Sequence, residues 1–109
     1  MGSVSVKRWD VCLAYVGFED AEDFKTRPVL ILGETALLLD ALMMTGQPPR
    51  PGEYALKYWA EAGLHKQTAV RVSKRLRLSE EAVIKKIGSL QPADILEIEK
   101  IILSEPFTD

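Results

Sequence analysis

The residue types that most often carry catalysis or bind metals are scarce in this chain. Among its 109 residues, Cys12 is the only cysteine and His65 the only histidine. A zinc site built from these residue types needs about three or four of them, and acid–base cleavage by a histidine pair needs a second histidine. A lone cysteine also excludes an intramolecular disulfide. We therefore expect Cys12 to be a small core residue and His65 to lie on the surface.

Basic side chains are a second possible source of chemistry, because they are concentrated in one part of the chain. The sequence has 14 Lys and Arg against 16 Asp and Glu, a formal net charge of −2, which weighs against a general nucleic-acid coat protein. Between His65 and Lys86, however, seven residues are basic and only two are acidic. This stretch has two interpretations, the solvated face of a sheet or a phosphate-binding face.

The size and apolar content of the chain suit one domain, assigned to residues 4–105, with 47% apolar residues to form its core. The longest apolar runs, such as residues 29–32, are far shorter than the roughly 20 residues of a membrane-spanning helix. The N-terminus lacks an apolar signal region. A cytoplasmic location is therefore expected.

Several segments have the alternating or β-rich pattern of strands, namely residues 7–16, 27–33, 68–78 and 84–90. The strand at 68–78 places Arg71, Arg75 and Arg77 on one side, which predicts a strongly cationic face. Residues 34–45 are ambiguous, because their Ala, Leu and Met content favours a helix whereas their spacing also fits a strand. Residues 47–52 include three prolines and are expected to form a loop.

Two helices are predicted, a short internal one and a longer one at the C-terminus. Residues 54–62 have the spacing of a short helix. Pro92 marks the start of an amphipathic helix, whose apolar face contains Ile95, Ile98 and Ile102. The pattern as a whole predicts a mostly β (α+β) fold built on a small, strongly bent sheet or barrel.

The order of several short motifs is more specific than any one of them alone. In chain order they are Phe18-Glu19-Asp20, Lys25-Thr26-Arg27-Pro28 with the apolar residues 29–32, residues 39–45, Ala62-Gly63-Leu64-His65-Lys66, Val70-Arg71-Val72, and residues 84–95 (IKKIGSLQPADI). This ordered set runs from about residue 8 to about residue 103. It resembles the PemK/MazF family of toxin endoribonucleases.

The resemblance implies an SH3-like small barrel with a short internal helix and a C-terminal amphipathic helix, and it favours a strand for residues 34–45. It also implies a homodimer and a cognate antitoxin encoded by a neighbouring gene. The implied substrate is single-stranded RNA, cleaved without a metal or other cofactor. The RNA 2′-hydroxyl attacks the adjacent phosphorus and leaves a 2′,3′-cyclic phosphate and a 5′-hydroxyl.

The family's motifs also indicate which residues carry catalysis. The family's catalytic arginine immediately precedes the proline, which here is Arg27, and its catalytic threonine ends the following strand, which here is Thr45. Arg27 offers a planar set of donors to phosphate oxygens, and Thr45 offers a hydroxyl donor. The further residues expected to contact RNA are Lys25, Asp20, Gln47, Ser73, Lys74 and Arg75.

Two other functions fit parts of the same pattern. A catalytically degenerate barrel of this type would bind protein or nucleic acid without cleaving RNA. A gyrase-poisoning toxin with a related barrel would not need Arg27-Pro28 and Thr45 together, so their joint presence disfavours that function. Retained binding without cleavage would distinguish the degenerate barrel from the enzyme.

Overall fold

A computed structural model describes residues 6–17, 24–35 and 38–104 of the chain. The elements of this part, in chain order, are β1 (Asp10–Gly17), β2 (Phe24–Thr35), β3 (Leu38–Thr45), β4 (Glu53–Ala55), β5 (Ala69–Ser79), the 3₁₀ turn η1 (Glu80–Ala82), β6 (Val83–Ser89) and α1 (Pro92–Ser104). The C-terminal helix begins at Pro92, as predicted. The ambiguous stretch forms the end of β2 and all of β3, so the resemblance was right to favour a strand.

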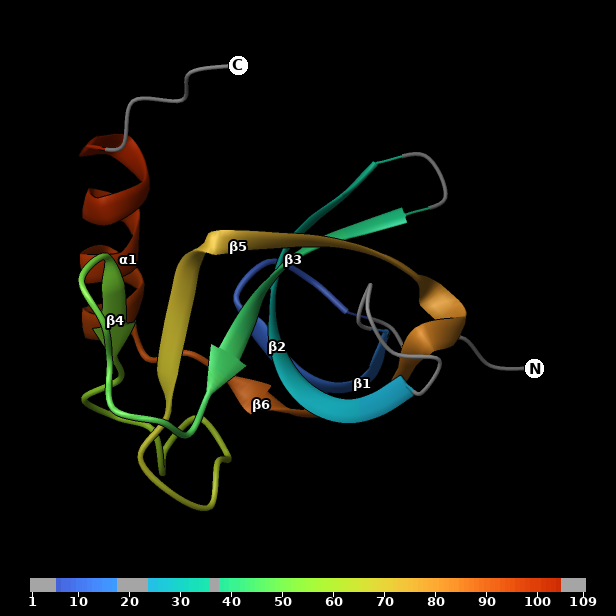
Figure 1. The fold of residues 1–109 in the computed structure, drawn as a ribbon, viewed down its shortest axis with the longest axis horizontal. Coiled ribbons are helices and arrows are strands. Elements are labelled where there is room, and N and C mark those ends of the chain that lie inside the picture. The colour runs from blue at the N-terminus through green and yellow to red at the C-terminus, as the bar shows by residue number, and fades with distance from the viewer. Residues whose placement is uncertain (1–5, 18–23, 36–37, 105–109) are drawn as a thin grey trace.

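The strands form one antiparallel six-stranded sheet in the order β4-β5-β3-β2-β1-β6. The sheet curls into a barrel-like shape, and α1 lies beside β4 at one end of it (Figure 1). The predicted mostly β fold with a C-terminal helix is thus confirmed. No helix of the described residues is long and apolar enough to cross a membrane.

Alternate residues of the same strands form two hydrophobic clusters, one on each face of the sheet. The first cluster packs under α1 and contains Val11 and Leu30 together with Ile98 of the helix. The second contains Cys12 and Val29, the chain neighbours of the first two, and no residue of α1. Because side chains alternate along a strand, the position of a residue in its strand shows which of these two faces it belongs to.

β5 changes face along its length, so the prediction of a single cationic side for residues 68–78 is wrong. In the pairing with β3, Met43 lies opposite Arg71 whereas Leu42 lies opposite Arg75, and residues 72–74 form a bulge between them. A bulge bends its strand and interrupts the alternation of side chains. Arg71 therefore shares the face of Met43, and Arg75 shares the opposite face with Leu42.

The predicted short helix at residues 54–62 is also wrong. Tyr54 and Ala55 belong to β4 and pair with β5, and the residues that follow form turns up to Gly63, which has a φ of +93°. Helix propensity is a weak preference that tertiary contacts often override. Here the pairing of β4 with β5 withdraws the first residues of the segment from any helix.

A buried carboxylate fixes the segment after β4 against the start of α1. Asp94 is fully buried in the first turn of the helix. Its Oδ1 accepts hydrogen bonds from the Tyr54 hydroxyl (2.6 Å) and the Lys57 N–H (3.0 Å), and its Oδ2 accepts one from the Tyr58 N–H (2.9 Å). Burial, followed by the bond to Asp94, raises the pKa of Tyr54. The two backbone bonds give a second reason why residues 54–62 are not helical.

Candidate active site

Arg27 and Thr45 lie on neighbouring strands at the same end of the sheet. The ladder between β2 and β3 ends with Val29 opposite Met43. Two residues beyond this pair are Arg27 on β2 and Thr45, the last residue of β3. By alternation, both residues belong to the face of Val29 and Met43, although the β2–β3 pairing itself ends at that pair. Ala14, which pairs with Arg27 on the other side, belongs to the same face.

Thr45 opens onto a hollow of about 110 Å³ at the end of β3. The described residues that line it come from β3, β4, β5 and the loop between β3 and β4, and they are Thr45, Gln47, Pro48, Arg50, Glu53 and Arg71. The Gln47 N–H donates to the Thr45 Oγ1 at 3.1 Å. Since this bond uses the hydroxyl oxygen as an acceptor, the hydroxyl hydrogen remains to be donated to a ligand.

Arg71 is held in the hollow by Glu53 on the adjacent strand. The two residues are opposite each other in the β4–β5 pair, and the Arg71 Nε donates to the Glu53 Oε2 at 2.9 Å. The Glu53 Oε1 accepts the Arg50 N–H at 3.1 Å. The bond from Arg50, followed by those of Arg71, lowers the pKa of Glu53. The ionised carboxylate thus fixes the Nε side of Arg71. Among the described residues no hydrogen bond uses its terminal nitrogens, so these can donate to a ligand.

Lys25 extends the row of basic side chains along β2. Lys25 and Arg27 pair with Val16 and Ala14 of β1, which are both in the second cluster. The two basic residues therefore lie on the same side of β2. Lys25 is exposed and Arg27 is half-buried, with its Nε buried.

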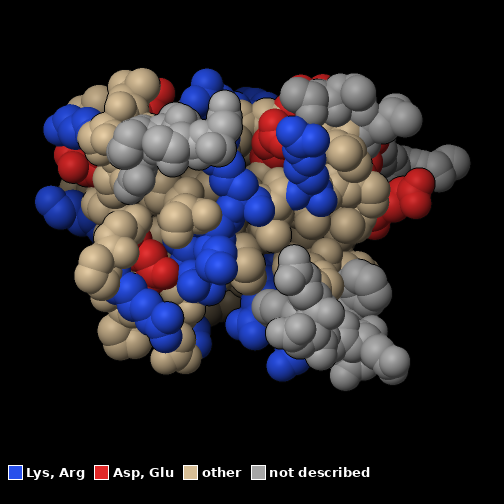
Figure 2. Space-filling model, turned by 45° about the horizontal axis from the view of Figure 1, so that its top comes forward, with Lys and Arg blue, Asp and Glu red and all other residues tan. Residues whose placement is uncertain are grey.

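Basic side chains also gather in a band across the middle of one face of the molecule, with a few acidic side chains beside it (Figure 2). The near-zero net charge of the chain therefore hides an uneven surface. A local positive field of this kind attracts polyanions and speeds their association.

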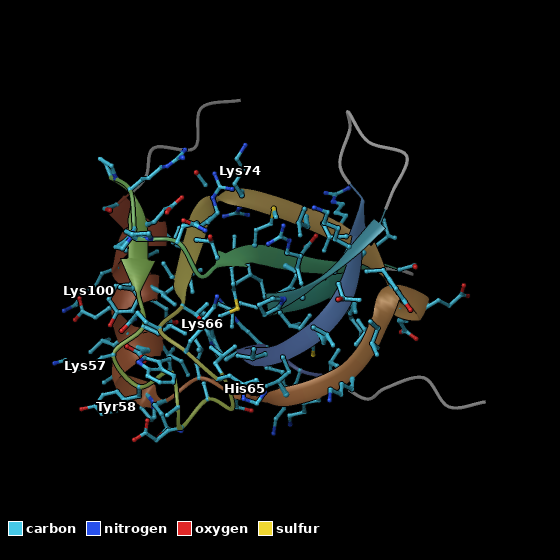
Figure 3. All side chains as sticks on the ribbon, turned by 60° about the horizontal axis from the view of Figure 1, so that its bottom comes forward. Lys57, Tyr58, His65, Lys66, Lys74 and Lys100 are labelled. Carbon is cyan, nitrogen blue, oxygen red and sulfur yellow. The ribbon has the colours of Figure 1, made fainter. Side chains whose placement is uncertain are left out.

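The structure does not bring every predicted RNA-contacting residue to the hollow at Thr45. Ser73 and Lys74 lie exposed in the bulge of β5, and Lys74 projects at the bend of that strand, away from Lys66 and His65 (Figure 3). Arg75 lines a separate hollow of about 280 Å³. Asp20 lies outside the described residues. Gln47 is thus the one predicted contact residue among the described residues that line the hollow, whereas Lys25 and Arg27 share a side of β2 outside that lining.

The single cysteine and histidine take no part in this arrangement. Cys12 is completely buried, and burial, followed by the nearby Asp10, raises the pKa of its thiol to about 11. This confirms the prediction of a core cysteine. His65 is exposed beside Lys66, which confirms its predicted surface position. In the part of the chain that the structure describes, no group of three or more His, Cys, Asp or Glu is placed to hold a metal ion.

The sequence patterns gave Arg50 and Glu53 no role and placed Arg71 only on a general cationic face, although all three line the hollow. Glu53 and Arg71 are 18 residues apart and meet only through the pairing of β4 with β5. Because the sequence predicted a helix where β4 ends, it gave no indication of that pairing. The register of a sheet, rather than any local motif, brings these residues to Thr45.

Solved structures share this fold over most of the chain. An endoribonuclease in complex with its cognate antitoxin, from a mycobacterial species, has a TM-score of 0.72 and 17% identity over 95% of this chain and 100% of its own. Another mycobacterial endoribonuclease has a TM-score of 0.70 and 16% identity over 99% of this chain and 98% of its own. The Mycobacterium tuberculosis toxin MazF-mt6 has a TM-score of 0.68 and 19% identity over 85% of this chain and 91% of its own. No family model and no curated protein matches the chain. The fold of this chain is therefore the fold of these toxins and endoribonucleases.

Proposed function

We propose that this protein is the toxin of a toxin–antitoxin pair, an endoribonuclease of the PemK/MazF type that cleaves single-stranded RNA without a metal. The observation that supports the proposal is that Arg27 and Thr45 lie on neighbouring strands, each two residues beyond the last pair of the β2–β3 ladder, in a fold shared with endoribonucleases. These are the two residues to which the resemblance assigns catalysis.

In the proposed reaction the ribose 2′-oxygen attacks the adjacent phosphorus, and the bond from phosphorus to the 5′-oxygen breaks. The 2′-hydroxyl proton passes to solvent, and the leaving 5′-oxygen takes up a proton from solvent. The products are a 2′,3′-cyclic phosphate and a 5′-hydroxyl. Because the nucleophile and the leaving group both belong to the RNA, the protein needs to position the strand and stabilise the charge of the phosphorane.

The side chains around Thr45 suit that task. The Arg27 guanidinium stabilises the phosphorane oxygens, since a group with a pKa above about 12 is a poor proton acceptor. The Thr45 hydroxyl donates to the same phosphate. Arg71 is fixed through its Nε by Glu53 at 2.9 Å. It offers further donors from β5, which flanks β3 on the edge away from β2. Lys25 contacts a neighbouring phosphate.

The proposal includes a protein partner and a second copy of the chain. The likeness to an endoribonuclease solved with its cognate antitoxin supports an antitoxin partner. An acidic, extended antitoxin segment would compete with RNA for the basic band of Figure 2. We further propose that the toxin acts as a homodimer in the cytoplasm, where its RNA substrate is found.

A cleavage assay in EDTA tests the enzymatic proposal. Purified protein and a mixed-sequence RNA should give fragments with 5′-hydroxyl ends. Arg27→Ala should lower the rate about 10²- to 10³-fold, the usual cost of losing one donor to an oxyanion. Arg77→Ala is the matched control, because that side chain is 74% exposed and lies on another part of the sheet. Intact RNA over a broad substrate set would refute the enzyme, and binding without cleavage would favour the degenerate barrel.

A further inference from the structure

A cavity of about 450 Å³ lies on the face of β1 and β2 opposite to Arg27. Its volume falls within the range of small-molecule sites, roughly 300–1,000 Å³. The apolar part of its lining consists of Leu13, Pro28, Leu64 and Ile87. The basic part consists of His65, Lys66, Lys85 and Lys86. The labelled side chains of His65 and Lys66 lie close to each other in Figure 3.

The wall of the cavity is fixed by close backbone packing. Gly63 and Gly88 allow residues 62–66 to lie directly against β6. A Cβ on Gly63 would lie 2.5 Å from the Ile87 carbonyl oxygen, and a Cβ on Gly88 would overlap the Ala62 carbonyl oxygen. The Thr68 hydroxyl donates to the Lys66 carbonyl oxygen at 2.9 Å. The cavity is therefore preformed, and a ligand need not order it.

The charge of the cavity favours an anion. None of the described residues that line it is acidic. The Lys86 Nζ is 3.4 Å from the buried carboxylate of Asp10, which offsets its charge, so Lys66 and Lys85 supply the net positive charge of the rim. An apolar floor beneath two such ammonium groups fits a planar ring that carries a phosphate.

The cavity is also next to the candidate active site. Pro28 follows Arg27 directly and pairs with Leu13. The Lys66 side chain lies against Gly46, the residue after Thr45, since a Cβ on Gly46 would be 2.6 Å from the Lys66 Cε. The cavity walls are thus one residue away from Arg27 in the chain and in contact with the neighbour of Thr45.

We propose that this cavity binds one nucleotide of the RNA, with the base on the apolar floor and its phosphate at Lys66 and Lys85. This inference rests on the proposed function for its substrate, but the cavity itself is testable without cleavage. Such a subsite would hold the strand beside the scissile phosphate and would select the base at one position near the cut.

Titration with nucleoside 5′-monophosphates (AMP, CMP, GMP and UMP), followed by amide NMR shifts, tests the cavity directly. At least one nucleotide should shift the signals of Leu64 and Ile87. Leu13→Trp fills the cavity without entering either cluster and should abolish these shifts, whereas the matched control Leu103→Trp, at a position that is 84% exposed on α1, should keep them. No shifts with any of the four nucleotides, or equal shifts with inorganic phosphate alone, would overturn the proposal.

RNA cleavage gives the second arm of the test. Leu13→Trp should lower kcat/KM about 5- to 100-fold, mainly through KM, as expected for one lost base contact. Lys85→Gln should weaken RNA binding, and Lys57→Gln serves as its exposed control. Nucleotide binding at the cavity without RNA cleavage would refute the proposed function and leave the subsite standing. A Leu13→Trp protein that cleaves normally but binds the antitoxin poorly would assign the cavity to the protein partner and overturn the inference.

Discussion

The first turn of α1 and the hollow at the end of β3 are both polar, yet they differ in how their hydrogen bonds are satisfied. Asp94 is fully buried, and both of its oxygens accept hydrogen bonds from the chain itself. In the hollow, the Thr45 Oγ1 accepts one bond from Gln47, and among the described residues no hydrogen bond uses the Thr45 hydroxyl hydrogen or the terminal nitrogens of Arg71. A polar group that is satisfied within the chain stabilises the fold, whereas one with donors left over is available to a ligand.

This difference gives a clear expectation for mutants. Changes at Asp94 should lower the free energy of unfolding and leave the chemistry of the folded protein intact. Changes at Thr45 should lower the cleavage rate and leave the free energy of unfolding nearly unchanged. A mutant at either position that lowered the free energy of unfolding and the cleavage rate equally would contradict this difference between the two regions.

The largest expected effect is on stability, from Asp94→Ala. The substitution leaves the Tyr54 hydroxyl and two backbone N–H groups without their buried acceptor. The free energy of unfolding should fall by about 3–5 kcal/mol, as for the loss of one partner of a buried charged network. Urea unfolding measures this loss. A decrease below about 1 kcal/mol would show that water replaces the carboxylate and that the site is not an anchor.

Thr45→Val should have its effect on activity instead. The substitution keeps the shape of the side chain and removes the hydroxyl donor, so the cleavage rate should fall by about 10²-fold, or about 2.7 kcal/mol. The free energy of unfolding should change by less than about 0.5 kcal/mol, because this residue is only partly buried at a strand end. Single-turnover cleavage and urea unfolding of the same preparation compare the two. Unchanged cleavage would remove Thr45 from the mechanism.

Local patterns predicted most of the fold. Alternating or apolar β-rich patterns located β1, β2, β5 and β6, and the proline start and apolar spacing located α1. They failed at residues 54–62, because the helical spacing of Leu56, Trp59 and Ala60 competes with contacts that are distant in sequence. Pairing with β5 and the bonds to Asp94 decide that segment, and neither is visible in a local window.

In the candidate site, too, short motifs indicate some residues, whereas contacts between distant parts of the sequence decide the others. The resemblance indicated Arg27 and Thr45 from short motifs, and the ladder of β2 with β3 places them at one end of the sheet. The sequence patterns placed Arg71 only on a cationic face and gave Glu53 no role, because only the register of the sheet brings these two residues to Thr45. The bulge at residues 72–74 likewise separates side chains that simple alternation grouped together, since a bulge depends on how the whole sheet bends.

Glu53→Gln should have the smallest effect and should depend on pH. The pKa of Glu53 is lowered from its ordinary value of 4.5, first by the Arg50 N–H and then by Arg71. A lowered pKa means that the carboxylate stabilises the fold above the unfolded pKa, and that this contribution is lost as pH falls through the folded pKa. Wild type should therefore exceed Glu53→Gln in the free energy of unfolding near neutral pH, and the difference should shrink as the pH falls below the ordinary pKa of 4.5.

The same substitution distinguishes positioning from mere stability. A neutral amide in place of the Glu53 carboxylate would be too weak a partner to fix the Arg71 Nε, which Glu53 now holds at 2.9 Å. Glu53→Gln should therefore raise KM for RNA at neutral pH while kcat changes less. The wild-type KM should rise toward the mutant value on acidification, because protonation of Glu53 releases Arg71 in the same way. A difference in KM that stays constant from neutral to acidic pH would show that the charge of Glu53 does not position Arg71, and that this ion pair, like Asp94, serves the fold alone.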